Sequence, residues 1–236
     1  DKAPMLYIGE KVGNGKSGLN FDIALDPLEG TKITANNEKN ALTVISLGNK
    51  GSFLNAPDVY MEKIAVGKGL PKNFLDLDIP LEETLNNLAF YKKKKINDLV
   101  VCFLDRPRHS KISNIVDKYK CKKFLIPDGD IFGAIATAIK KFKIDIYVGI
   151  GGAPEGVLAA AALKCLGGQM QGRLIFNDNK QKTRAKSMGI KDLKKKYNIK
   201  DLIKKDSLFS ATGVTNGYLL NGIKKKGNIF ITHSLI

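Results

Sequence analysis

The chain has no tryptophan, two histidines and three cysteines among its 236 residues. Cys102, Cys121 and Cys165 are odd in number and lack the spacing of a zinc site, which favours reduced thiols in a cytosol. His109 and His233 have no partners at catalytic spacing, so we interpret both as structural. The composition therefore argues against zinc sites and disulfide frameworks.

Long apolar runs are also missing. No stretch of 18 or more apolar residues occurs, and the first residues show no signal-peptide pattern. We therefore expect no membrane span and a cytoplasmic location. Hydrophobic residues make up 43% of the chain, which is typical of a globular protein with one sizeable core or two small ones.

Arginine is scarce although the net charge is +16. Only four of the 39 basic residues are arginines, and the 35 lysines are spread along the chain without interleaved aromatic residues. Base recognition depends on arginine and single-strand binding on aromatic stacking, so we expect no nucleic-acid partner. A general attraction for small anionic substrates remains compatible with this charge.

The most informative segment is the sequence DPLEGT at residues 26–31. Before it, Phe21, Ile23 and Leu25 alternate at period two, which predicts a half-buried strand that ends at Asp26. Pro27 fixes φ and should turn the chain out of the sheet. The segment is thus predicted to form a rigid acidic turn at a strand end.

The chemistry of this turn suits a hard cation. Asp26 and Glu29 supply oxygen ligands, which Mg²⁺ and Mn²⁺ prefer, and Gly30 allows close approach to a ligand. The alternative is an ordinary acidic turn that caps a helix, and this segment alone does not exclude it.

Two glycine-rich segments resemble nucleotide-binding motifs but depart from them. Residues 13–17 (GNGKS) lack the first glycine of a Walker A loop, because Glu10 stands there, and the following residues favour a strand. In residues 149–154 (GIGGAP), Pro154 replaces the third glycine of a dinucleotide fingerprint. We interpret the first as a turn and leave the second for another explanation.

The periodicity predicts two parts, residues 1–95 and 96–236. The first is strand-rich, with a strand at 41–47 and a helix that contains Leu81, Leu85 and Leu88 and is entered through Pro80. The second alternates strands and helices in a Rossmann-like manner, which predicts a mostly parallel sheet with helices on its faces. The expected strands are 99–104, 123–126 and 144–148, and the expected helices are 112–119, 131–142 and 157–166.

Polar clusters follow each strand of this second part. Because ligands of α/β sheets bind outside the carboxyl ends of the strands, we expect these clusters to share one site. Arginine pairs suit phosphate, aspartates suit sugar hydroxyls, and an acid in the first turn of a helix can face a cation. The clusters are Arg106-Pro107-Arg108-His109, Asp128-Gly129-Asp130 and Gly151-Gly152-Ala153-Pro154-Glu155-Gly156.

Each cluster also has an ordinary structural explanation. Arg106 and Arg108 suit a solvated surface pair, while Asp128 and Asp130 suit helix caps. Glu155 suits the first turn of a helix, with Pro154 at the first helical position.

Together, six segments resemble the class II fructose-1,6-bisphosphatases of the lithium-sensitive sugar-phosphatase superfamily. DPLEGT indicates only the superfamily, whereas NAPDVYMEK, PDGD and the GGAPEG part of residues 149–160 are specific to this branch. The segments are DPLEGT (26–31), NAPDVYMEK (55–63), RPRH (106–109), PDGD (127–130), GIGGAPEGVLAA (149–160) and SATGVTNG (210–217).

The resemblance implies a layered α/β/α/β/α sugar-phosphatase fold and hydrolysis of fructose 1,6-bisphosphate to fructose 6-phosphate and phosphate in gluconeogenesis. It also implies Mn²⁺ or Mg²⁺ as cofactor, a cytoplasmic location and a homodimer or homotetramer. Two alternatives stay open. One is the same chemistry on sedoheptulose 1,7-bisphosphate, alone or in addition, and the other is a non-catalytic sugar-phosphate sensor.

The resemblance also implies roles for individual residues. Asp26, Glu29 and Glu155 match metal ligands, with the Leu28 carbonyl as a further ligand, and Asp26, Glu155 and Thr31 are the catalytic set. Thr31 matches the hydroxyl that orients the attacking water. The matching substrate-binding positions are Glu29, Gly30, Thr31, Tyr60, Arg106, Pro107, Arg108, Asp128, Gly129, Asp130 and Gly152.

The chain departs from the family pattern in three places. Residues 1–5 (DKAPM) resemble the interior of the family's sequence, so we expect an upstream segment with further acidic ligands. The stretch 176–188 is shorter than expected, and the chain stops early after Ile236.

Overall fold

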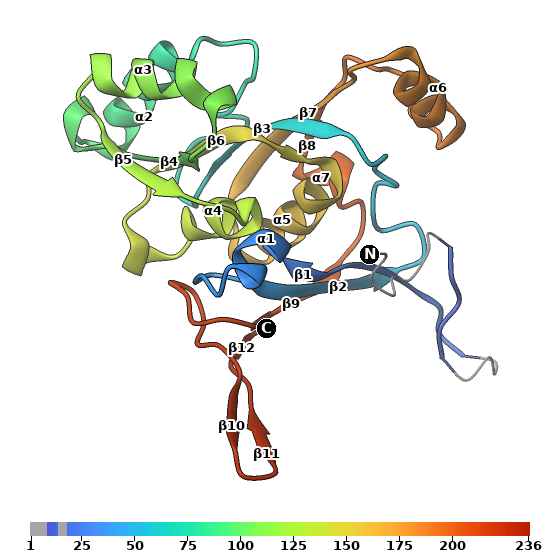
Figure 1. The fold of residues 1–236 in the computed structure, drawn as a ribbon. Coiled ribbons are helices and arrows are strands. Elements are labelled where there is room, and N and C mark those ends of the chain that lie inside the picture. Colours follow the sequence, from blue (N-terminus) through green and yellow to red (C-terminus); the bar gives the residue numbers. More distant parts are fainter. Residues whose placement is uncertain (1–8, 14–17) are drawn as a thin grey trace.

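The computed structural model describes residues 9–13 and 18–236, so most of the turn expected at 13–17 lies outside the described residues. Two larger sheets and one hairpin organise this part of the chain (Figure 1). The four-stranded sheet has the order β1-β2-β9-β12, and the six-stranded sheet has the order β5-β4-β6-β3-β7-β8. The strands are β1 (Phe21–Glu29), β2 (Leu42–Asn49), β3 (Tyr60–Val66), β4 (Val100–Leu104), β5 (Lys122–Ile126), β6 (Ile146–Gly152), β7 (Gln169–Ile175), β8 (Lys196–Asn198), β9 (Ser207–Gly213), β10 (Lys224–Lys226), β11 (Ile229–Ile231) and β12 (Ser234–Leu235).

Helices fill the space between the sheets and cover one outer face. In Figure 1, α4 and α5 lie between the two sheets, and α2 and α3 cover the opposite face of the six-stranded sheet. The α-helices are α1 (Thr31–Ala35), α2 (Leu81–Lys92), α3 (Ser110–Lys118), α4 (Asp130–Ala136), α5 (Ala153–Leu166), α6 (Asn179–Ser187) and α7 (Ile199–Leu202). Three short 3₁₀ helices are η1 (Ile96–Asp98), η2 (Pro107–His109) and η3 (Lys140–Phe142).

Two apolar cores stabilise these layers. The larger core joins α4 and α5 to both sheets, and its centre is the run of alanines from Ala159 to Ala162 in α5. This helix is apolar all round, as expected for a helix buried between two layers. Its small side chains let it approach both sheets closely. The second core packs α2 and α3 on the six-stranded sheet through Leu85, Leu88 and Val116.

The α/β class is thereby confirmed, and the described residues supply four alternating layers of helix and sheet. The outer face of the four-stranded sheet is exposed among the described residues, where Phe21 is 53% and Leu208 48% accessible. The fifth layer of the expected α/β/α/β/α fold stays a prediction. Within the described ranges, no helix combines the length and apolar character that a membrane crossing requires.

The predicted parallel arrangement is correct for the half of the sheet formed by β5, β4 and β6 and wrong for the other half. β4 runs parallel to β5 and β6, as the alternation of strands and helices predicts. β3, however, lies antiparallel between β6 and β7, and β8 is antiparallel to β7. The sheet is therefore mixed, because a strand from the first part of the sequence inserts beside β6.

Both sheets take strands from both sides of residue 95. β3 enters the six-stranded sheet, and β9 returns to pair with β2 in the four-stranded sheet. The domain division at residue 95 stays a prediction, and it does not coincide with the division between the sheets.

Most predicted elements are present with shifted ends. The helix expected at 131–142 ends at Ala136 and is followed by η3. The strand expected at 144–148 instead spans Ile146–Gly152, so the glycine-rich segment belongs to β6. The helix expected at 157–166 begins earlier, at Ala153, and Gly167 ends it with a left-handed φ of 74°.

Candidate active site

The site begins with an irregularity in β1. This strand does not end at Asp26, as the sequence predicted, but continues to Glu29. Asp26 pairs with Val44 and Glu29 with Leu42, so three steps along β1 oppose two steps along β2. This is a β-bulge, in which one extra residue changes the direction of the side chains.

The bulge explains how two carboxylates three residues apart share one face. Successive side chains of a regular strand point to opposite faces, which would separate Asp26 from Glu29. With one extra residue between them, both lie opposite the buried residues Val44 and Leu42, on the side facing α5. The alternating apolar side chains of Phe21 and Ile23 occupy the exposed face, so the predicted burial of that face is wrong.

Glu29 is 5% exposed and connects β1 to α4. Its Oε1 accepts a hydrogen bond of 2.9 Å from the Ile131 backbone N–H, whereas its Oε2 is buried without a partner in the described part of the chain. Burial raises the pKa of Glu29 well above its ordinary value, and the charge of Asp130 adds to the increase.

Gly30 turns the chain from β1 into α1. Its φ of 87° is left-handed, and a Cβ atom there would lie 2.7 Å from Cδ1 of Ile33, so only glycine fits without strain. Thr31 then begins α1 with an exposed side chain. This places its hydroxyl directly after the carboxylates, at a position open to solvent.

Asp130 begins α4 and is 6% exposed. Its side chain makes no capping hydrogen bond and forms an ion pair with Lys63 of β3, so the explanation as a helix cap is wrong for this residue. Gly129, at φ 84°, gives the turn before α4 its left-handed conformation. The sequence analysis assigned no role to Lys63, although a lysine directly before the apolar residues Ile64, Ala65 and Val66 is a visible signal.

Glu155 lies in the first turn of α5, one residue after Pro154, which occupies the second helical position. Its Oε2 is buried without a partner among the described residues. Burial raises the pKa of Glu155; the nearby charge of Lys63 lowers it, and those of Asp130 and Asp26 raise it further. A Cβ atom on Gly152 would lie 1.9 Å from Oε2, so this glycine makes room for the carboxylate.

The glycines of residues 149–156 now have a physical explanation. A Cβ atom on Gly151 would lie 2.0 Å from Oδ2 of Asp130, and one on Gly156 would lie 2.6 Å from Sδ of Met61. These glycines leave space for side chains from β3, α4 and α5, and no dinucleotide need be invoked.

Asp26, Glu29, Asp130 and Glu155 thus form one carboxylate cluster, in which Glu29 and Asp130 are buried and Asp26 and Glu155 are half-buried; we call it the buried carboxylate cluster. Burial is the largest cause of the raised pKa of Asp26, opposed by a 3.0 Å hydrogen bond from the Leu28 N–H to its Oδ1. A divalent cation fits this environment, because it would satisfy the two buried oxygens without partners and offset the mutual repulsion. No three histidine, cysteine or acidic side chains of the described residues are close enough to form a complete metal-binding group on their own.

The two arginines near the carboxyl end of β4 lie in different surroundings. Arg106 lies 3.6 Å from Asp128 and lines a cavity of about 300 Å³ with Lys32 of α1. Arg108 donates to the Ile150 carbonyl at 3.0 and 2.8 Å and lies 5.4 Å from the centre of the Tyr60 ring. The expected pair is therefore divided between two places.

The Arg108 side chain lines a second cavity, of about 380 Å³, on the face of the six-stranded sheet covered by α2 and α3. Tyr60, which lies beneath its guanidinium, is 45% exposed at the start of β3. A cation held over an aromatic ring keeps a defined orientation, so the remaining donors of Arg108 are directed rather than mobile.

His109 links the ends of β4 and β6. The Ile150 N–H donates to Nε2 at 2.8 Å, so the ring proton is on Nδ1, which donates to the Leu104 carbonyl at 2.8 Å. Burial lowers the pKa of His109, which favours the neutral ring. His109 is thus structural, as interpreted from the sequence, and it fixes the backbone from which Arg108 extends.

Comparisons with known proteins agree with this arrangement. A family model described as "Bacterial fructose-1,6-bisphosphatase, glpX-encoded" matches residues 1–236. The chain is 45% identical to "Fructose-1,6-bisphosphatase 1 class 2" of Escherichia coli (strain K12), over all of this chain and 74% of that protein. It is 43% identical to "Fructose-1,6-bisphosphatase class 2" of Haemophilus influenzae over the same shares, and 40% identical to "Fructose-1,6-bisphosphatase 2 class 2" of E. coli, of which it covers 77%.

Proposed function

Because the chain belongs to the class 2 fructose-1,6-bisphosphatase family, we propose that it hydrolyses the 1-phosphate of fructose 1,6-bisphosphate to give fructose 6-phosphate and phosphate. The observation that carries this proposal is the buried carboxylate cluster, drawn from β1, α4 and α5 to one place. Such a cluster is costly to fold and is expected where charge chemistry needs it.

The proposed metal ligands are Asp26, Glu29 and Glu155, with the Leu28 carbonyl as a further ligand. Mn²⁺ or Mg²⁺ bound there would neutralise phosphate oxygens and lower the pKa of a water molecule. The buried Oε2 atoms of Glu29 and Glu155 support this assignment, since each lacks a hydrogen-bond partner among the described residues.

The chain's own groups orient the reactants in this proposal. Thr31 holds the attacking water through its hydroxyl, at the start of α1. Gly30 and Gly152 keep the backbone close to the substrate, because neither carries a side chain. Asp128, Gly129 and Asp130 bind the sugar hydroxyls.

The second phosphate is assigned to basic side chains near the end of β4. Arg106, Pro107, Arg108 and Tyr60 hold the phosphate that is not cleaved, which supplies the energy for orienting the sugar. Two cations, Arg106 and Lys32, and one acid, Glu38, line the same cavity, and this excess of positive charge supports an anionic substrate. Because the two arginines lie in different surroundings, we expect them to contact different oxygens of this phosphate.

The direct test is release of inorganic phosphate by the purified protein with Mn²⁺ or Mg²⁺. We expect release from fructose 1,6-bisphosphate that a chelator abolishes, and the same assay with sedoheptulose 1,7-bisphosphate decides between one substrate and two. Binding of the bisphosphate without release under either metal would favour the sugar-phosphate sensor and overturn the enzymatic proposal.

A cytoplasmic location, a homodimer or homotetramer, and independence from nucleic acid and membranes complete the proposal. The location and oligomeric state rest on the family resemblance. The proposed absence of a nucleic-acid partner rests on the scarcity of arginine. Sedimentation of the purified protein measures its oligomeric state.

A further inference from the structure

Lys63 of β3 is a buried cation beside the carboxylate cluster. It is 1% exposed, and no other lysine or arginine in the described part of the chain is buried to this extent. A lysine normally keeps its ammonium group in water, so its burial requires a specific charged partner. That partner is Oδ2 of Asp130.

The surroundings of Lys63 leave room for its ammonium. A Cβ atom on Gly151 would lie 3.2 Å from Nζ of Lys63, and one on Gly156 would lie 3.2 Å from its Cε. β3 carries Lys63 on the face toward α5, because Met61, two residues earlier, also points to this side. Elements from three parts of the sequence therefore enclose one charged group.

Negative charges outnumber the positive charge of Lys63 in this part of the structure. Asp130 directly contacts it, and Glu155 is close enough for the ammonium to oppose the increase in pKa that burial causes. The charge of Asp130 in turn raises the pKa of Glu29 and Asp26. One ammonium therefore interacts with two carboxyl groups of a cluster of four.

We propose that Lys63 is a positioning residue that serves as the internal cation of the carboxylate cluster. Its ammonium holds Asp130 in place and offsets part of the negative charge that a divalent metal would otherwise meet. This role rests on the proposed function of the same site. It predicts that Lys63 sets the metal affinity of the cluster, which an ion pair with only a structural role would not do.

The test compares the thermal stabilisation by Mn²⁺ in the wild type and in Lys63→Met, which removes the charge and keeps the length. Without metal, we expect a lower Tm for the variant because Asp130 loses its partner. We expect the apparent Kd for Mn²⁺, from the dependence of Tm on concentration, to fall about tenfold because one nearby positive charge is gone.

A charge-restoring variant separates electrostatics from packing. Lys63→Met combined with Asp130→Asn removes one charge of each sign, so its Mn²⁺ affinity should return to that of the wild type. If Lys63→Met does not fold, Asp130→Asn alone provides the test. It leaves Lys63 with one negative neighbour fewer, and its Mn²⁺ affinity should fall about tenfold.

Lys94→Met is the matched control. Lys94 lies 2.8 Å from Asp145, which is 2% exposed. This ion pair lies just before the first residue of β6, at the end of the strand away from the cluster. We expect this variant to lower Tm in the absence of metal and to leave the Mn²⁺ affinity unchanged.

Equal Mn²⁺ affinities in the wild type and Lys63→Met, including undetectable binding in both, would overturn the inference. Phosphate release is measured separately on the wild type. A wild-type protein that releases no phosphate, while the two affinities differ as expected, would overturn the enzymatic function and leave the role of Lys63 standing.

Discussion

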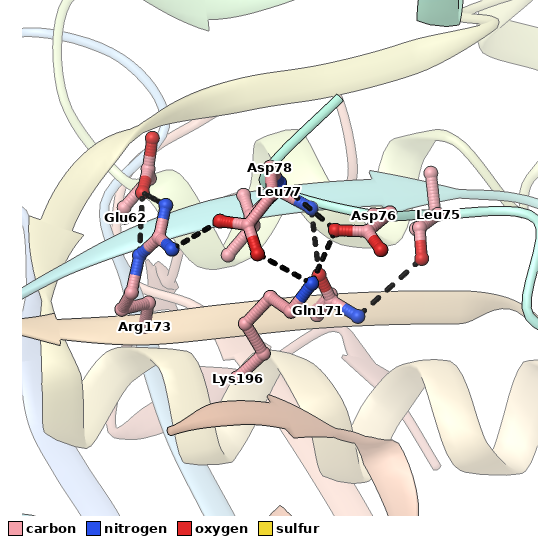
Figure 2. Close-up of polar contacts among 8 residues, drawn as sticks. All are labelled: Glu62, Leu75, Asp76, Leu77, Asp78, Gln171, Arg173 and Lys196. Carbon is pink, nitrogen blue, oxygen red and sulfur yellow. Dashed lines mark hydrogen bonds and ion pairs between the residues drawn. The ribbon is translucent and has the colours of Figure 1, made fainter. Parts of the chain in front are cut away.

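The two faces of β3 carry charged groups in opposite circumstances. Glu62 and Lys63 are neighbours in sequence, and the alternation of a strand sends their side chains to opposite sides of the sheet. Lys63 enters the buried carboxylate cluster, whereas Glu62 joins an exposed ion-pair network (Figure 2). The network consists of Glu62, Asp76, Asp78, Arg173 and Lys196.

The exposed network is close to balanced. Arg173 donates to Glu62 at 2.9 Å and also pairs with Asp78, while Lys196 lies 2.7 Å from Asp78 and also pairs with Asp76. Hydrogen bonds from Lys196 lower the pKa of both aspartates. Around this network, Gln171 ties down the loop before α2 by accepting from the Leu77 N–H at 2.7 Å and donating to the Leu75 carbonyl (Figure 2).

The difference teaches how to separate structural from functional charge. In the exposed network each acid pairs with a cation, and the pKa of Asp76 and Asp78 is lowered, which is the pattern of a structural ion-pair network. In the buried cluster the pKa of Asp26, Glu29 and Glu155 is raised, and two carboxylate oxygens have no hydrogen-bond partner in the described part of the chain. Several acids that are buried together without enough cations to balance them indicate a functional site.

The largest expected effect comes from removing one carboxylate of the buried cluster. We expect Glu155→Gln to lower turnover about a hundredfold or more at saturating Mn²⁺, because a charge that acts on the reacting phosphate is lost. Circular dichroism should show an intact fold. Glu62→Gln is the control from the exposed network and should keep wild-type turnover; similar losses in both variants would erase the distinction between the two faces.

Arg108 tests whether substrate binding extends to the face of β3 that carries the network. We expect Arg108→Ala to raise KM for the bisphosphate about tenfold, the scale of one charge-assisted hydrogen bond. Lys111→Ala, which removes another cation lining the same cavity, should change KM little. An equal loss of kcat/KM on a monophosphate substrate would show that Arg108 does not bind the second phosphate.

The buried carboxylate cluster and the exposed network should change the folding stability with pH in opposite directions. Without metal, native Asp26, Glu29 and Glu155 keep protons that the unfolded chain releases near its ordinary pKa values of 3.8 for Asp and 4.5 for Glu. Their contribution therefore makes stability fall as pH rises from these values through the raised folded ones. The lowered pKa of Asp76 and Asp78 makes stability fall as pH drops below 3.8.

Tm measured from about pH 3 to about pH 8 with a chelator present tests these signs. Glu155→Gln should flatten the decline on the alkaline side and leave the acid side unchanged. A wild-type Tm that climbs throughout this range, with no difference in the variant, would contradict the assignment of raised pKa values to the cluster.

The smallest effect is expected from the exposed network. Arg173→Met removes two ion pairs of a side chain that is 28% exposed, and we expect Tm to fall by no more than about 4 °C, with unchanged phosphate release. A tenfold loss of turnover would show that the network supports the site and is not merely structural.

Local sequence signals predicted the elements around the site well. The apolar run of β4, the period of α3 and the strand before Asp128 all appear close to their expected positions. The polar clusters follow the same ends of β4, β5 and β6 because these strands are parallel, as the alternation predicted. Each of these inferences depends on residues close together in sequence.

Other features depended on contacts that no local pattern contains. The alternation of Phe21 and Ile23 marks a strand, but it does not reveal which face the second sheet and α5 will cover. Similarly, the position of β3 beside β6 arises from pairing between segments more than 80 residues apart in sequence. The antiparallel insertion and the burial of Lys63 therefore could not be predicted.

The sequence by itself determined the chemical composition of this site: the acids, the glycines that give them space, and the arginines near the strand ends. Only the tertiary structure decided which groups act together, because the bulge in β1 turns Asp26 and Glu29 to one side and β3 brings Lys63 to Asp130. Residue types follow from the chain, whereas charge balance depends on distance and burial, which exist only once the layers have packed.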